Sequence, residues 1–309
     1  TRWQTLNAPH KTLLDGMPMP DANDEYLFYQ ALLGAWPGDR QTPNGDLRAR
    51  MADYMVKAAS EAKVHTTWIN PDEDYVAALQ GFVNGALDDA AFLEAFRPLQ
   101  QRVTFYGRFN SLAQTLLKLT SPGMPDIYQG TELWDDSLVD PDNRRPVDYE
   151  ARRRLLAEIK GLPEDVPANG TARARVLMET AAYGRLKLTV IALALALRHR
   201  HRAVFEQGTY TGLSAHGPRA EHVIAFAREH GDDTAIVVVP RLVVGLTDGQ
   251  ERPPVGPEVW GDTWMEVPAG RYRNAFTGED LVAEEREGTS GLPLAAVLGH
   301  FPVALLTRA

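Results

Sequence analysis

One loop of this sequence carries most of the side chains that could do chemistry. Between residues 130 and 146 it gathers carboxylates, an amide and two adjacent guanidinium groups beside aromatic rings: Glu132, Asp135, Asp136, Asp140, Asp142, Asn143, Arg144 and Arg145, with Tyr128 and Trp134 nearby. Such groups hydrogen-bond to sugar hydroxyls and stack on pyranose faces, so the composition suits a carbohydrate site. On composition alone, a solvated acidic loop whose arginine residues pair internally is the more frequent explanation, and spacing does not decide between the two.

Two carboxylates of this loop could be close enough for glycoside chemistry. Asp140 and Asp142 straddle Pro141, and retaining glycosidases place their carboxyl groups about 5 to 5.5 Å apart. However, Arg144 and Arg145 follow directly and would keep both carboxylates ionised, which makes poor general acids near neutral pH. We therefore interpret these two carboxylates as ligand holders rather than catalytic residues.

The remaining composition argues against other classes of function. A net charge of -9 opposes binding to nucleic acid, and the chain has no cysteine for disulfides or thiolate metal sites. Its 8 histidine residues are scattered, and His199 and His201 would point to different faces of a helix. No glycine-rich phosphate loop or G-x-S-x-G motif occurs. We predict no metal, and the lack of cysteine suits a cytoplasmic protein.

The pattern of residues 1–120 is almost entirely helical. Apolar stripes at helical spacing follow three predicted caps, namely Asp24, Asp46 and Asn70. A long periodic run from Phe92 to Leu117 predicts one helix, or two that meet at Pro98.

Residues 121–203 differ from the helical segment before them, because turn-forming residues interrupt the helical pattern. Prolines and glycines enclose Asp126–Gln129, which we predict to be a short strand, and a polar loop runs on to Pro146. A helix is expected from Tyr149 to Lys160, with Asp148 as its cap and Gly161 at its end. Residues 161–178 resemble a loop or linker. A helix follows over about 181–202, and its apolar run, Leu188 to Leu197, is too short to span a bilayer.

Residues 204–309 alternate with period two between glycine and aspartate clusters, which predicts an antiparallel β-domain. In a strand, Trp260 and Trp264 would share one face, where they would either stack on sugar or pack into a core; we favour the core. The predicted domains are therefore 1–120, 121–203 and 204–309.

Several segments resemble a known family. PGMPDIYQGTELWD followed by SLVDPDNRRPVDY is similar to the end of the barrel in maltooligosyltrehalose synthases, which belong to the α-amylase superfamily. DEYLFYQALLGAWP, SEAKVHTTWINPDEDY, GRLKL, FEQGTY and IVVVPRL agree with the same family, so the resemblance covers nearly the whole chain. The PG-x-P-x-x-Y-x-G-x-E pattern is general to the superfamily, whereas the GAWP and AKVHTTW segments are typical of this branch.

The resemblance implies an α+β fold: a mostly helical region that carries the last strand and helix of a (β/α)₈ barrel, followed by an antiparallel β-domain. It implies an isomerase of trehalose biosynthesis, (1→4)-α-D-glucan 1-α-D-glucosylmutase, which converts the reducing-end α-1,4 bond of maltooligosaccharides to α-1,1 without a cofactor. It also implies glucan contacts from Asp140, Asp142, Asn143, Arg144 and Arg145, with a nearby wall formed by Tyr128, Gln129, Glu132 and Trp134.

The family's catalytic carboxylates follow earlier barrel strands, and no segment of this sequence matches their motifs. The opening TRWQTLNAPHKT also has no initiator methionine or signal segment. We therefore expect a C-terminal part of a longer enzyme, inactive alone, whose partners are a maltooligosaccharide and the missing N-terminal barrel half, with no nucleic acid or membrane. Two alternatives stay open, a non-catalytic glucan-binding or assembly module and an α-glucan hydrolase of the same superfamily.

Overall fold

The computed structural model describes residues 2–38, 45–160, 167–181, 184–286 and 288–309. The chain forms two compact units, each assembled from two stretches of sequence. The first unit comprises Thr1–Thr104 and Asp135–Pro146, and the second comprises Phe105–Trp134 and Val147–Ala309. The three-part division predicted from the sequence is a different partition and stays a prediction.

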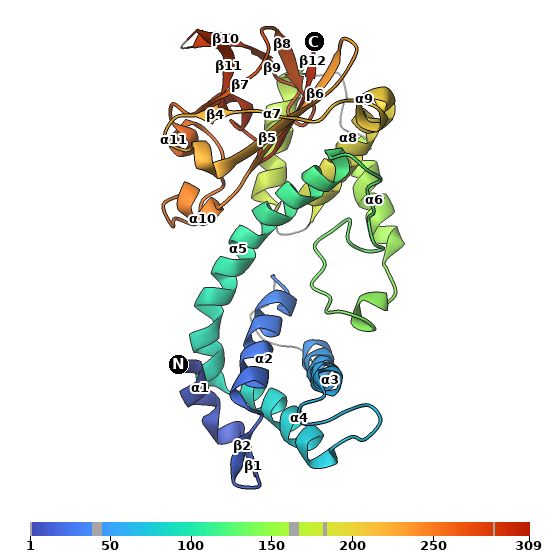
Figure 1. The fold of residues 1–309 in the computed structure, drawn as a ribbon, viewed down its shortest axis with the longest axis vertical. Coiled ribbons are helices and arrows are strands. Elements are labelled where there is room, and N and C mark those ends of the chain that lie inside the picture. Colours follow the sequence, from blue (N-terminus) through green and yellow to red (C-terminus); the bar gives the residue numbers. More distant parts are fainter. Residues whose placement is uncertain (1, 39–44, 161–166, 182–183, 287) are drawn as a thin grey trace. The chain divides into compact units, whose positions relative to one another are not determined.

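The first unit is mostly helical, with one short hairpin (Figure 1). Its elements are α1 (Arg2–Asn7), η1 (Ala8–His10), β1 (Thr12–Leu14), β2 (Met17–Met19), α2 (Ala22–Ala35), α3 (Gly45–Ala62), α4 (Glu73–Asp88), the first part of α5 (Ala90–Thr120) and η2 (Asp142–Arg144). The sequence analysis did not predict the β1–β2 hairpin. Helix α5 continues through Pro98 as a single helix, which decides between the two predicted arrangements.

Two helices of this unit begin at different caps from those predicted. The Asp21 carboxylate caps α2 by accepting from the Asn23 and Asp24 amides, and Asp72 caps α4. The predictions of Asp24 and Asn70 were wrong because several capping residues stand within three positions of each other. The residue that takes the cap is the one whose backbone is extended there, as at Asp21 and Asp72. Asp46 lies in the first turn of α3.

The first core lies among α2, α3, α4 and the start of α5, as the apolar stripes predict. Its largest fully buried side chains are aromatic: Phe28, Trp36, Tyr75, Phe82, Phe92 and Phe96. Several of these rings meet edge-on or tilted, for example Phe28 and Phe82 with centroids 5.5 Å apart. Because burial of one such side chain contributes about 1.5 to 3 kcal/mol, these aromatic residues hold α2, α4 and the start of α5 together.

The second unit places helices against β-sheets (Figure 1). Its main helices are the rest of α5, α6 (Tyr149–Lys160), α7 (Pro167–Glu179), α8 (Arg185–Arg200) and α9 (Arg202–Glu206). Asp148 accepts from the Ala151 amide at the start of α6, as predicted, while Gly161 lies outside the described residues. Helix α7 corrects the prediction of a linker over 161–178 from Pro167 onward, while residues 161–166 lie outside the described part of the chain. In the described part of the chain, no helix is long and apolar enough to cross a membrane.

The predicted antiparallel β-region is confirmed as two sheets and their connections. One sheet has the order β3-β5-β6-β12-β8-β9 and the other β10-β11-β7-β4, with all pairs antiparallel. The strands and short helices are β3 (Thr211–Gly212), β4 (Ala215–His216), η4 (Ala220–His222), β5 (Val223–His230), β6 (Asp233–Pro240), α10 (Val243–Leu246), α11 (Pro257–Trp260), β7 (Trp264–Glu266), β8 (Arg271–Asn274), β9 (Asp280–Val282), β10 (Glu284–Arg286), β11 (Thr289–Pro293), α12 (Leu294–Val297) and β12 (Ala304–Arg308).

The two tryptophan residues of the β-region are buried. Trp260 belongs to α11 rather than to a strand, and Trp264 lies in β7. Both have at most 5% exposure, so the core interpretation is confirmed. A Cβ atom on Gly291 would lie 2.4 Å from the Trp264 ring, which explains why β11 has glycine where it crosses this ring.

Residues Asp126–Gln129 do not form the predicted strand. The segment has no regular secondary structure, enters a turn at Gln129 and lies outside both sheets of its unit. A strand needs a neighbour to satisfy its backbone, and no element of the described chain pairs with this one.

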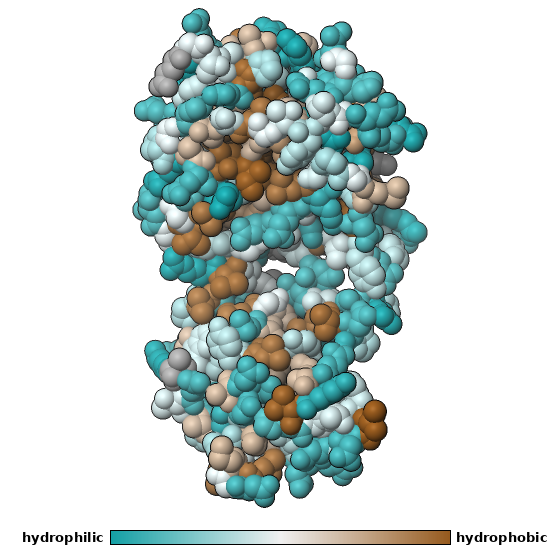
Figure 2. Space-filling view, viewed as in Figure 1, coloured by the Kyte–Doolittle hydropathy of each residue, from teal (hydrophilic) through white to brown (hydrophobic). Residues whose placement is uncertain are grey.

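On the face shown in Figure 2, hydrophilic residues predominate, with hydrophobic residues showing between them in separate groups.

The second unit is joined internally by one buried arginine. Arg228 on β5 is 2% exposed, and its guanidinium donates to four backbone carbonyl groups, those of Thr120, Phe205, Gly208 and Thr209. Thr120 is the last residue of α5, and Phe205 lies in the last turn of α9. Carbonyl groups at helix ends have no donor within the helix, so this one side chain satisfies the ends of two helices from a neighbouring strand.

We expect Arg228→Met to destabilise the chain by about 3 kcal/mol or more, because each buried carbonyl left without a donor costs about 1 to 3 kcal/mol. Equilibrium unfolding in urea measures the change. The control is Arg202→Met, which removes an exposed side chain that pairs with Glu206 one turn away and should cost about 0.5 kcal/mol or less. Equal stability of the two variants would contradict this role for Arg228.

Candidate functional site

The loop over 135–146 packs against α3 in the first unit. Leu138 inserts its side chain beside the aromatic core, and the backbone closes into the short helix η2. Two basic side chains of α3, Arg50 and Lys57, reach the loop from the helix. They stand seven positions apart, which places them on one face of α3. The loop is therefore held by hydrogen bonds from α3 and by the packing of Leu138 against the core.

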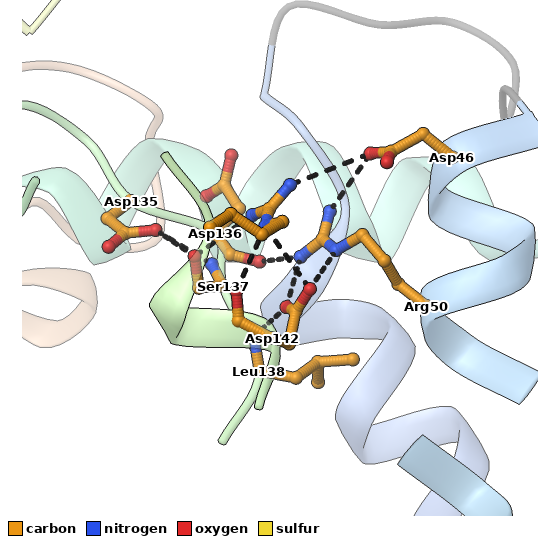
Figure 3. Close-up of polar contacts among 8 residues, drawn as sticks. Asp46, Arg50, Asp135, Asp136, Ser137, Leu138 and Asp142 are labelled. Carbon is orange, nitrogen blue, oxygen red and sulfur yellow. Dashed lines mark hydrogen bonds and ion pairs between the residues drawn. The ribbon is translucent and has the colours of Figure 1, made fainter. Parts of the chain in front are cut away.

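Arg50 makes three hydrogen bonds to this loop (Figure 3). Its Nε and Nη2 atoms donate to the two carboxylate oxygens of Asp142 at 2.8 and 2.9 Å, and Nη2 also donates to the Asp136 carbonyl at 2.7 Å. Nη1 faces Asp46, one turn earlier on α3, at 3.7 Å. The side chains of Arg50 and Asp142 are only 10% and 12% exposed, so this bidentate pair is shielded from water.

Asp142 also binds within its own loop. The Leu138 amide donates to its Oδ2 at 2.6 Å, and Arg145 approaches its Oδ1 at 3.3 Å. Burial alone would raise the pKa of the Asp142 carboxyl, but the hydrogen bonds from Arg50 and Leu138 outweigh it, so the pKa lies below its ordinary value. For Arg50, burial acts to lower the pKa and Asp142 raises it, with a net increase. Both groups are therefore charged at neutral pH.

Arg145 and Arg144 are adjacent in sequence but differ in role. Arg145 turns into the loop, where its Nε donates to the Asp142 carbonyl and its Nη2 to Ser137 Oγ, both at 3.0 Å. Arg144 turns outward and forms a 2.5 Å ion pair with Asp140, one turn before it. The side chains of Arg144 and Asp140 are 63% and 47% exposed, respectively, in contrast to the shielded pair of Arg50 and Asp142.

Asp140 has a fixed backbone and an exposed carboxylate. Lys57 Nζ donates to its carbonyl at 2.5 Å, while the carboxylate faces Arg144. The hydrogen bond from Arg144, with a further one from Asn143, lowers the pKa of this carboxyl. Asn143 Oδ1 is buried and has no donor among the described residues. The loop thus presents an ionised acceptor and a charged donor fork side by side at its surface.

The other four predicted site residues belong to the second unit, before the loop. Tyr128 is 44% exposed and Gln129 is also exposed. Glu132, by contrast, pairs with Arg152 of α6 at 2.9 Å, and the same guanidinium donates to the Gly130 carbonyl at 2.5 Å. Tyr128 and Gln129 are therefore accessible to a ligand, whereas Glu132 joins its segment to α6.

Trp134 is bound to its own unit. Its Nε1 donates to the Ala181 carbonyl at 2.6 Å, and the Lys187 ammonium of α8 lies 5.9 Å from the ring centroid. Gly184 precedes α8 with a φ of 75°, and a Cβ atom there would lie 3.2 Å from the backbone nitrogen of Trp134. The ring is partly buried against the helical core of this unit.

Sequence reasoning missed Arg50 and Lys57, the two residues that hold the loop. Arg50 stands 92 positions before Asp142, so no local pattern links them. The available signal was the polar stripe of Asp46, Arg50 and Lys57 on one face of α3. Such a stripe is normally a solvated helix face, which is how it would have been interpreted. The part of the chain that the structure describes contains no group of three or more His, Cys, Asp or Glu side chains able to hold a metal ion.

No family model matches this chain. A curated protein of Mycobacterium tuberculosis, named "Putative maltooligosyl trehalose synthase", is 35% identical over 291 residues, which are 94% of this chain and 32% of that protein. The solved structure of maltooligosyltrehalose synthase from Arthrobacter ramosus superposes over 100% of this chain and 35% of its own, with 32% identity and a TM-score of 0.74. This chain belongs with the C-terminal part of the maltooligosyltrehalose synthases.

A further maltooligosyltrehalose synthase structure agrees. A hypothetical maltooligosyl trehalose synthase of Sulfolobus tokodaii has 25% identity and a TM-score of 0.67, covering 99% of this chain and 34% of its own. The chain thus spans about a third of the length of the relatives it matches. The predicted family and the α+β fold are confirmed, and the chain corresponds to one part of a maltooligosyltrehalose synthase.

The lowered pKa of Asp142 predicts a specific pH dependence. A carboxylate whose native pKa lies below its unfolded value contributes stability that is present above about pH 4 and is lost as the pH falls through the native pKa. Asp142→Asn should therefore be less stable than the unmodified chain at pH 7, and this deficit should shrink below pH 4. Urea unfolding at several pH values measures it.

The control for this comparison is Asp53→Asn. Asp53 is exposed on α3, so this substitution also removes one negative charge but lies outside the 135–146 loop. Its deficit at pH 7 should be much smaller than that of Asp142→Asn. A deficit of Asp142→Asn that stays constant down to pH 2.5 would exclude a charged Asp142 as the cause of the stabilisation.

Proposed function

We propose that this chain supplies part of the glucan site of an enzyme that rearranges the reducing-end α-1,4 bond of a maltooligosaccharide into α-1,1. The sequence relation to maltooligosyltrehalose synthases over 94% of the chain supports this reaction. The observation that carries the binding role is the exposed pair of Asp140 and Arg144 on a loop whose inner face is otherwise occupied. In this proposal the activity is (1→4)-α-D-glucan 1-α-D-glucosylmutase, and it uses no cofactor.

The exposed pair is suited to a sugar. A glucose unit presents hydroxyl groups that both donate and accept, so the Asp140 carboxylate can accept one hydrogen bond while the Arg144 fork donates to a neighbouring oxygen. The two side chains partner each other without the ligand, which keeps both charged groups satisfied in water. Asn143, next to them, also hydrogen-bonds to the Asp140 carboxylate.

The second unit carries candidate glucan-binding residues of its own in this proposal. The exposed Tyr128 ring can stack on a pyranose face and the Gln129 amide can bind a hydroxyl, whereas Glu132 and Trp134 hold their segment to α6 and α8. The nucleophile and general acid come from upstream barrel segments, so the chain alone is inactive and its partner is that barrel part. The absence of cysteine supports a reducing compartment, the cytoplasm.

The rearrangement also sets a demand on the site. A retaining reaction through a covalent glycosyl-enzyme requires the released glucose to turn and attack with its anomeric hydroxyl before water does. A fixed loop that holds the glucan and limits water access meets this demand better than a flexible one.

The reaction type can be tested with a full-length protein that carries this chain after its upstream barrel part. An α-1,1 bond uses both anomeric carbons, so the rearrangement should lower the reducing-sugar signal of a maltooligosaccharide without release of glucose. Hydrolysis would raise that signal, and a glucan-binding module would leave it unchanged while still binding the ligand. Either of these outcomes would replace the proposed activity.

The role of the exposed pair can be tested with Arg144→Ala in the same protein. We expect kcat/KM to fall about tenfold or more, chiefly through a higher KM, because the variant loses contacts to bound glucan. The melting temperature should change little, since an exposed pair within one turn contributes only about 0.3 to 0.5 kcal/mol. Arg153→Ala is the matched control, as it removes an exposed arginine that pairs with Glu150 on α6. Unchanged kinetics in Arg144→Ala would remove this pair from the glucan site.

A further inference from the structure

We propose that Arg50, assisted by Lys57, is the positioning residue that sets the shape of the 135–146 loop, and that Asp142 serves this clamp rather than binding sugar. The proposal rests on the proposed function for its consequence, the placement of Asp140 and Arg144, but its structural part concerns only contacts within the first unit.

The contacts assign Asp142 to the clamp. Each of its carboxylate oxygens accepts a hydrogen bond from Arg50, and one of them also accepts from the Leu138 amide at 2.6 Å. The Asp142 side chain is 12% exposed, and both of its oxygens already accept hydrogen bonds. A sugar hydroxyl would have to displace a charge-assisted bond to reach it, so Asp142 is unsuited to be a direct ligand.

The guanidinium of Arg50 holds the loop at two points. Its contact with the Asp136 carbonyl fixes the start of the loop, and its contact with Asp142 fixes the beginning of η2. Lys57 adds a third point at the Asp140 carbonyl. Figure 3 shows the Arg50 side chain reaching from α3 toward Asp142, with Asp46 on its other side.

The placement of the exposed pair follows from these points. Asp140 is itself held at its carbonyl, and Arg144 lies two residues after Asp142. A shift of the loop by a fraction of an ångström would therefore move the carboxylate and the guanidinium together. Groups that orient a binding residue without touching the ligand typically change activity about 10- to 100-fold when removed.

The clamp can be measured independently of catalysis. In the full-length protein, trypsin cleavage between Arg144 and Arg145, followed by mass spectrometry, reports the freedom of the loop. We expect Arg50→Ala to accelerate this cleavage at least several-fold, and Arg48→Ala to leave it unchanged. Arg48 is the matched control, because it lies on the same helix but pairs with Asp88 of α4. An unchanged cleavage rate in Arg50→Ala would overturn the clamp.

The functional part of the inference has its own measurement. Arg50→Ala should lower kcat/KM about 10- to 100-fold, mostly through KM, and low concentrations of guanidinium ion should partly restore it by filling the vacated place beside Asp142. A variant that is merely unstable would lose activity further in this denaturant. Absence of rescue, together with unchanged KM, would overturn the positioning role.

A double-mutant comparison completes the test. Combined with Asp142→Asn, Arg50→Ala should have little additional effect on kcat/KM, because both variants break one clamp. If their effects multiply, Asp142 acts on the glucan by itself and the proposal is overturned. Failure of the proposed function is distinguishable, because it would show as the wrong product in the unmodified enzyme while the trypsin result stands.

Discussion

The ion pair between Arg50 and Asp142 is the constraint on which the candidate site depends. It joins residues 92 positions apart, is mostly shielded from water, and uses both carboxylate oxygens together with two nitrogens of the guanidinium. A bidentate pair of this kind fixes direction as well as distance, so the loop backbone can adopt only a narrow range of positions relative to α3. Every side chain that the loop exposes inherits its position from this contact.

The second unit uses an arginine for a comparable purpose with different partners. Arg228 has no carboxylate beside it in any contact described above; it satisfies carbonyl groups at the ends of α5 and α9 and so joins two helices to a strand. Burial lowers the pKa of Arg228, which is the expected sign for a cation held by backbone dipoles alone. In both units, long-range arginine contacts rather than local propensity decide how loops and helix ends are fixed.

Much of the fold was predictable because it rests on local patterns. The apolar stripes of α2, α3 and α4, the Asp148 cap of α6 and the alternating β-strands all follow from spacing. Errors arose where several residues were chemically equivalent, as at the Asp21 and Asp72 caps. Helix α7 was missed because its sequence has little amphipathic period, and the short β1–β2 hairpin because three-residue strands carry almost no pattern.

The sequence by itself determined the family, the presence of sugar-compatible carboxylates, guanidinium groups and aromatic rings at the loop, and the cores that support it, because these depend on which residues are present and how they are spaced. Only the tertiary structure decided that Asp142 is shielded beside Arg50, that Arg145 donates back to its own loop, and that Asp140 and Arg144 pair at the surface. Neighbouring residues of identical type look the same in a sequence. What separates them is whether α3 places a partner beside them, and that is a property of the folded chain alone.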